Sequence, residues 1–169
     1  MQHELINLFA VPVYKASLGR KFEQAELDYI NKQLQTPVQA ISNYSSQNKS
    51  VLNAPEMSAL RQFSESHLNK YFARVYDTEN DARLVITQSW LSLTGKGGAH
   101  HTHSHPNSIA SGVIYINLAA NDGINFYRDE DRQWFELKPR ENNYYNAYSY
   151  FVEASIGDIV IFPSHIKHG

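Results

Sequence analysis

Histidines gather in two short stretches of the chain, and their type and spacing could support metal chemistry. Six of the eight histidines lie within residues 100–105 and 165–168. Imidazole nitrogen is a good ligand for iron, zinc, copper and nickel. The chain contains no cysteine, so thiolate metal sites, disulfides and cysteine nucleophiles are excluded. The two stretches therefore predict a metal site whose protein ligands are imidazoles.

The spacing within the first stretch suits adjacent metal ligands. Side chains of an extended strand alternate between its two faces, so residues i and i+2 share a face. His101, His103 and His105 are therefore expected to point one way, and His100 the other. Neighbouring members of that set of three could bind one ion together.

The second stretch follows a buried-strand pattern. Residues 159–162 read IVIF, Pro163 ends the run, and His168 lies five residues further on. A histidine at the mouth of a barrel strand could supply a third ligand. Such a facial set leaves open positions for a substrate and dioxygen. His165 is expected behind the ligands or at the surface.

The elements that must position these histidines change in type along the chain. Apolar residues at helical spacing predict helices at about 21–35 and 55–75. From residue 82 onward, short β-rich runs are separated by turn signals. The expected strands cover residues 8–14, 84–93, 111–118, 124–127, 148–152 and 159–162. We expect an α+β chain that is mainly β, with a small barrel or jelly roll as its core and the two helices packed outside.

Length and charge narrow the class of protein further. The 169 residues suit one domain, with a helical support region at about 1–80 and the β core at about 82–169. A net charge of -2 gives no electrostatic case for nucleic-acid binding. No apolar run approaches the roughly 20 residues of a membrane span, and the first residues lack the pattern of a signal peptide. We expect a cytoplasmic protein, with its oligomeric state, homodimer included, left open.

Several segments together resemble one enzyme family. They are Ser89-Trp90, the run HSHPNS at 103–108, SGVIYI at 111–116, GDIVIFPS at 157–164 followed by His168-Gly169, and LFAVPV at 8–13. This combination is similar to the 2-oxoglutarate/Fe(II)-dependent oxygenases of phages and marine bacteria. The resemblance implies a double-stranded β-helix fold, and a place in the host cytoplasm if the chain is phage-encoded.

The resemblance also implies an activity and a ligand set. The activity is a dioxygenase reaction that uses 2-oxoglutarate as cosubstrate and hydroxylates a substrate that the sequence does not name. Fe(II) would be held by His103, His105 and His168, with His101 as a competitor for the register of the first two. Tyr115 is expected to face the cosubstrate or the core, and Ser111 and Asn107 are further candidates for polar contacts with the cosubstrate.

Two features depart from the family's pattern. His105 stands where most such oxygenases have a carboxylate, so zinc or nickel becomes a stronger alternative to iron. The family also places a cosubstrate-binding arginine beyond the last histidine, where this sequence stops. We therefore expect a longer native chain that adds an arginine and a closing strand. The internal cations that could replace that arginine are Arg128, Arg132, Lys138, Arg140 and Lys167.

A cupin-like protein is the main alternative. Gly157-Asp158, a strand and a proline before a histidine also resemble the second cupin motif. The first cupin motif expects a glutamate where this chain has Ile109 and Ala110. The alternative function is therefore a cupin-like, metal-binding jelly-roll module without oxygenase turnover.

Overall fold

The computed structural model describes residues 3–79, 81–128 and 138–169, so Arg132 lies outside the described residues. The described part is mostly β-structure with two α-helices, as expected. The strands are β1 (Tyr14–Ser17), β2 (Val38–Gln39), β3 (Tyr44–Ser45), β4 (Ser92–Leu93), β5 (Ala110–Ile114), β6 (Gly123–Tyr127), β7 (Ser149–Glu153), β8 (Asp158–Pro163) and β9 (Lys167–His168). The helices are α1 (Gln24–Gln33) and α2 (Ser58–Tyr76), with short 3₁₀ turns η1 (Val51–Asn53) and η2 (Pro55–Met57) between them.

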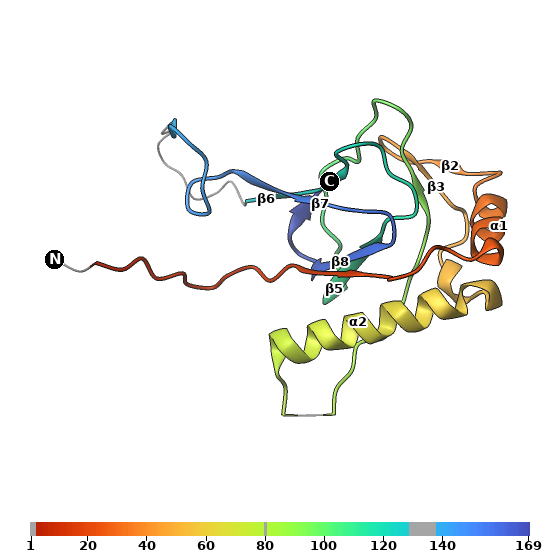
Figure 1. Cartoon of the computed structure of the whole chain (residues 1–169), viewed down its shortest axis with the longest axis horizontal. Coiled ribbons are helices and arrows are strands. Elements are labelled where there is room, and N and C mark those ends of the chain that lie inside the picture. The colour runs from red at the N-terminus through yellow and green to blue at the C-terminus, as the bar shows by residue number, and fades with distance from the viewer. Residues whose placement is uncertain (1–2, 80, 129–137) are drawn as a thin grey trace.

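The strands form three small antiparallel sheets. Their orders are β1-β8-β5, β2-β3-β4 and β7-β6-β9. Figure 1 shows the first and third of these sheets on one side of α2, with β8 and β5 nearer to the helix than β6 and β7. The N-terminal region therefore supplies β1 to a sheet of the core as well as the two helices.

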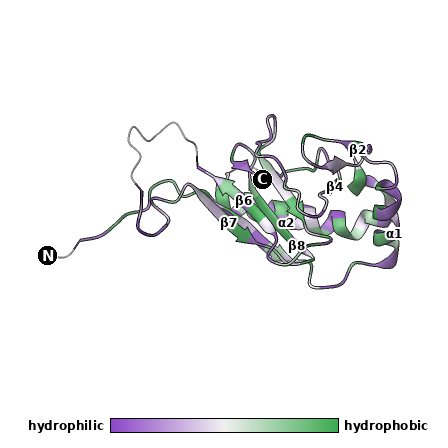
Figure 2. Cartoon of the chain, turned by 90° about the horizontal axis from the view of Figure 1, so that it is seen from above, coloured by the Kyte–Doolittle hydropathy of each residue, from purple (hydrophilic) through white to green (hydrophobic). Residues whose placement is uncertain are grey.

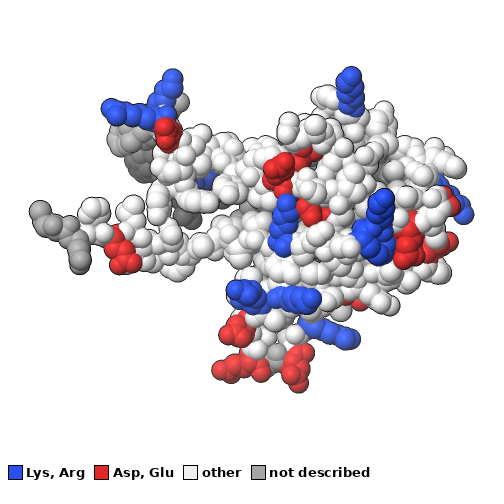
Figure 3. All heavy atoms as spheres, viewed as in Figure 1, with Lys and Arg blue, Asp and Glu red and all other residues white. Residues whose placement is uncertain are grey.

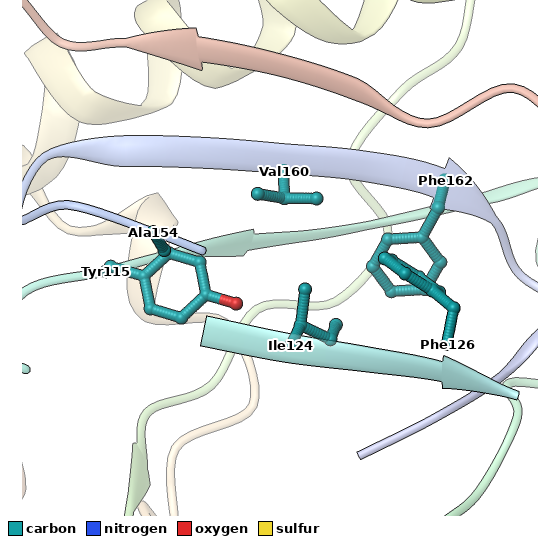
Figure 4. Close-up of a cluster of buried hydrophobic side chains, with 6 residues drawn as sticks. All are labelled: Tyr115, Ile124, Phe126, Ala154, Val160 and Phe162. Atoms are coloured by element: carbon teal, nitrogen blue, oxygen red, sulfur yellow. The ribbon is translucent and has the colours of Figure 1, made fainter. Parts of the chain in front are cut away.

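Strand β8 is the centre of this arrangement because it is buried on both faces. All six of its residues are buried. Ile159 and Ile161 pack against Tyr71 of α2. Val160 and Phe162 point the other way, into a cluster with Ile124 and Phe126 of β6 and with Tyr115 and Ala154 (Figure 4). The strand alternation thus places one apolar row against the helix and the other against the second sheet.

The two helices confirm the expectations from apolar spacing, with α1 somewhat shorter than predicted. A reciprocal capping box between Glu23 and Glu26 starts α1. The Glu26 carboxylate is fully buried and accepts two hydrogen bonds from the Arg20 guanidinium, at 2.6 and 2.9 Å. Pro55 opens the 3₁₀ turn that leads into α2, and Asp77 ends that helix in the left-handed conformation.

Three expected strands differ from the structure. The strand expected at 111–118 is observed as β5, which ends at Ile114. In place of a strand at 8–14, β1 begins at Tyr14, and Phe9 is 96% exposed on an extended N-terminal arm (Figure 1). Of the expected strand at 84–93, only the last two residues pair as β4. The backbone just before β4 is hydrogen-bonded to a loop instead. The Ser89 N–H donates to the carbonyl oxygen of Lys49, and the Leu91 N–H donates to the Ser46 hydroxyl.

The surface is mixed in polarity and charge. Figure 2 shows apolar residues along β6 and β8 and polar residues at the periphery. On the face in Figure 3, lysines and arginines are interspersed with acidic residues and form no continuous basic stripe. Among the described helices, none has the length and apolar character needed to cross a membrane.

Candidate metal centre

A short antiparallel backbone pairing brings the two histidine stretches together. His103 and His168 exchange both of their N–H···O=C hydrogen bonds, each 2.9 Å long, as a single β-bridge. The N–H of His105 donates to the carbonyl of Ser164, also at 2.9 Å. Residues directly opposite in such a pair have neighbouring side chains on the same face. The backbone therefore sets His103 beside His168, with His105 two residues along on that face.

The three side chains converge. His103, His105 and His168 each offer one ring nitrogen, and these atoms lie within 4.8 Å of one another. Their ring centroids are 4.4 Å (103 and 168), 4.8 Å (103 and 105) and 5.1 Å (105 and 168) apart. His168 is buried, and the other two are half-buried. Three imidazole nitrogens this close could hold one ion, and a set of three imidazoles fits iron, zinc or nickel.

Hydrogen bonds to backbone carbonyls determine which nitrogen of the His103 and His168 rings can bind a metal. Nδ1 of His103 lies 2.8 Å from the carbonyl oxygen of His101, and Nδ1 of His168 lies 2.8 Å from that of Ile166. A carbonyl oxygen can only accept, so both Nδ1 atoms carry the proton. Nε2 of each ring is left with its lone pair. Metal-binding histidines are oriented by this kind of hydrogen bond.

The surroundings favour neutral imidazoles. Burial lowers the pKa of His168 to about 4, and the neighbouring His103 and His105 act in the same direction. Burial also lowers the pKa of His105, with His103 adding to the effect. A metal binds only the deprotonated lone pair, so these rings are in their ligating form at neutral pH.

Aromatic side chains support the histidines from the protein interior. The ring of Phe162 meets that of His168 edge-on at 4.5 Å and that of Phe126 at 5.0 Å. Phe162 is fully buried at the end of β8. Trp90, which is 39% exposed, contacts His105 edge-on at 5.7 Å from the surface. The core cluster of Figure 4 therefore contacts His168 through Phe162.

The expected cosubstrate residues lie in three different settings. Tyr115 belongs to the core cluster, with its hydroxyl pointing into the space between β8 and β6 in Figure 4, and burial raises its pKa. The Ser111 hydroxyl bonds to that of Ser164 at 2.8 Å. Asn107 is exposed in a turn with a φ of 60°, a backbone conformation that asparagine tolerates well. His165 is exposed, as expected.

The prediction that His100 points away from the other histidines is wrong. Its ring lies 4.7 Å from that of His103 and 5.2 Å from that of His101. Of residues 100–105, only His103 pairs as a β-bridge, so strict strand alternation does not apply to His100. His101 does stack on His103 at 4.8 Å, on the expected face. The described histidine group that includes His168 contains His105, however, and not His101.

The basic residues considered as replacements for the family's arginine differ in their contacts and exposure. The Arg128 guanidinium donates to the carbonyl oxygens of Tyr145 and Tyr144, at 2.7 and 3.1 Å. Lys138 and Arg140 are exposed, and so is Lys167 on β9.

Sequence reasoning missed Ser164 as part of the site. Ser164 is fully buried. Its carbonyl oxygen accepts a hydrogen bond from the His105 N–H, and its hydroxyl is hydrogen-bonded to the hydroxyl of Ser111. A polar residue directly after the buried run IVIFP was the available signal.

The chain therefore combines antiparallel sheets with a convergent group of three histidines that could hold a metal ion. Residues 88–169, just under half of the chain, match the family model described as "Putative 2OG-Fe(II) oxygenase", and this segment carries all the site histidines. The family's description implies Fe(II) and 2-oxoglutarate. A source in phages or marine bacteria stays a prediction. No curated protein matches the chain.

Proposed function

We propose that the protein is a non-haem Fe(II), 2-oxoglutarate-dependent dioxygenase in which His103, His105 and His168 hold the metal. The observation that carries the proposal is the convergence of these three ring nitrogens within 4.8 Å, inside the segment that matches the oxygenase family. A double-stranded β-helix is the architecture we propose for the core. The two facing sheets around the cluster of Figure 4 support it.

The bound metal and cosubstrate would supply dioxygen activation for a hydroxylation. One oxygen atom of O₂ enters a C–H bond of the substrate, and the other enters succinate as 2-oxoglutarate loses CO₂. The chain's own residues bind and orient. The carbonyls of His101 and Ile166 hold two rings with Nε2 free, and Phe162 and Phe126 exclude water beneath His168.

Three imidazoles give the site a distinctive charge. Neutral ligands leave the whole charge of a divalent ion uncompensated, whereas a carboxylate ligand would cancel part of it. A dianionic cosubstrate then compensates the ion more fully. The Tyr115 hydroxyl, directed between the sheets in Figure 4, is our proposed polar contact for that cosubstrate, with Ser111 and Asn107 as the other two candidates.

The test is succinate release from 2-oxoglutarate under air with Fe(II) and ascorbate, together with metal-dependent binding of 2-oxoglutarate without oxygen. We expect the wild type to show both and His168→Ala to show neither. His165→Ala is the matched control, because it removes an exposed imidazole three residues away and should keep both. Equal activity in His168→Ala and the wild type would refute the assignment.

A metal-binding module without turnover is the second candidate. The observation that favours it is the all-histidine ligand set, together with an Arg128 guanidinium already bound to two backbone carbonyls. A dianion needs a cation with matching geometry at its far carboxylate. Metal binding by the wild type with no 2-oxoglutarate binding in the same assay would support this candidate.

A further inference from the structure

A second group of three histidines lies beside the first. His100, His101 and His103 also offer one ring nitrogen each within 4.8 Å of one another. Their ring centroids are 4.7 to 5.2 Å apart, nearly as close as the 4.4 to 5.1 Å of the first group. All three are half-buried. The geometry that makes the first group a candidate metal site is therefore present twice.

One atom of this second group lacks a role in the protein. Nδ1 of His101 is buried, and no hydrogen-bond partner is found for it within the described part of the chain. A buried polar atom without a partner carries the full cost of its desolvation. A metal ion in contact with this ring would relieve that penalty by taking the lone pair or by reorienting the ring.

The backbone holds the same segment in place. An ideal Cβ on Gly169 would lie 2.9 Å from the carbonyl oxygen of His100 and 3.2 Å from that of His101. Gly169 is in turn paired with Asn125 of β6 through two backbone hydrogen bonds. The main chain of the second group is thus packed against the sheet that carries His168.

The two groups share His103, and this ring can serve only one of them at a time. Its Nδ1 proton is donated to the carbonyl of His101, so only Nε2 has a lone pair. One lone pair makes one metal bond. An ion held by the second group therefore withdraws His103 from His105 and His168.

We propose that His100, His101 and His103 form an outer metal position that is an exclusive alternative to the inner position of His103, His105 and His168. It takes a divalent ion that prefers imidazole, such as Zn²⁺, Ni²⁺, Cu²⁺ or Co²⁺. The chain holds one ion in either position, and the outer position is nearer to solvent because it lacks the buried His168. The part of this inference that concerns the inner position rests on the proposed function.

The test is a titration with Co²⁺, whose visible ligand-field absorption reports its ligands, with binding stoichiometry measured in parallel. The wild type is expected to bind one ion. His105→Ala should still bind one, in the outer position and with a changed spectrum. His101→Ala should bind one in the inner position, and His103→Ala should bind none. The double variant His101→Ala/His105→Ala should also bind none.

The outcomes separate this inference from the proposed function. Loss of all binding in His105→Ala, with His101→Ala intact, overturns the outer position and leaves the proposed function standing. Loss of all binding in His101→Ala, with His105→Ala still binding one ion, overturns the inner position. Two ions bound at once by the wild type, or one by His103→Ala, overturns the shared ligand. Thermal unfolding monitors the fold, and His105→Gln replaces His105→Ala if the alanine variant is destabilised.

Discussion

Replacing Phe162 by leucine should weaken metal binding at the inner position as well as the fold. The phenyl ring meets His168 at 4.5 Å and Phe126 at 5.0 Å, both edge-on. An aromatic pair of this kind contributes about 0.5–1.5 kcal/mol beyond its buried area. If the contact with His168 holds that ring in its ligating orientation, its loss lowers metal affinity about 2- to 12-fold, at 1.4 kcal/mol per factor of ten.

The neighbouring residue on β8 provides the matched control. Ile161 is equally buried but packs against α2, on the opposite face of the strand. Ile161→Val should cost about 0.5–1.5 kcal/mol of unfolding free energy. It should leave metal affinity unchanged, because no ring of the site loses a neighbour.

The assay is a competition titration of Co²⁺ against a chelator, with both variants in the His101→Ala background so that only the inner position is measured. Urea unfolding of the same samples gives the stability change. Equal losses of affinity in Phe162→Leu and Ile161→Val would refute the reasoning, since the effect would then follow stability alone. Unchanged affinity in Phe162→Leu would also refute it.

Three further predictions concern stability, packing and the helical region. Glu26→Gln should cost about 2 kcal/mol of unfolding free energy at neutral pH, because one of the two charge-assisted hydrogen bonds from the Arg20 guanidinium is lost and the other loses its charged acceptor. Those hydrogen bonds hold the pKa of Glu26 below its usual range, so the wild type loses this stability as pH falls through the depressed pKa, and urea unfolding should show the two proteins converging in acid. Gly169→Ala should weaken Co²⁺ binding measured by titration, because its methyl group would press on the main chain at His100, and unchanged affinity would contradict that packing. Lys32→Ala, on the exposed face of α1, should leave succinate release unchanged, and its loss in a folded variant would place the helix in the substrate site.

The sequence predicted the candidate site more completely than it predicted the backbone around the site. Spacing alone put His103 and His105 on one face, and the buried run before His168 predicted a strand end. The bridge between His103 and His168 needs the register of two segments far apart in the chain, which local pattern does not contain. His100 could not be placed for the same reason, since its position depends on a backbone that is not a regular strand.

The missed strand positions have a similar physical cause. Residues 84–93 are rich in β-forming types, yet Ser89 and Leu91 bond to a loop from the first third of the chain. Propensity describes how well a residue fits a sheet, not which partner is available. The buried run of β8 was predicted well because it is apolar on both faces, and that pattern depends on few partners.

The position of β8 in the chain has a consequence for biosynthesis. Its neighbours in the sheet are β1, which pairs Tyr14 with Ile161, and β5, which pairs Gly112 with Ile161. A ribosome makes both neighbours long before β8, so neither has its central partner while the nascent chain grows. Contacts between such distant segments also slow folding. Apolar strand edges are therefore exposed during synthesis, when they are prone to aggregate. The yield of folded protein should therefore depend on chaperones more strongly than the stability of the folded state alone would suggest.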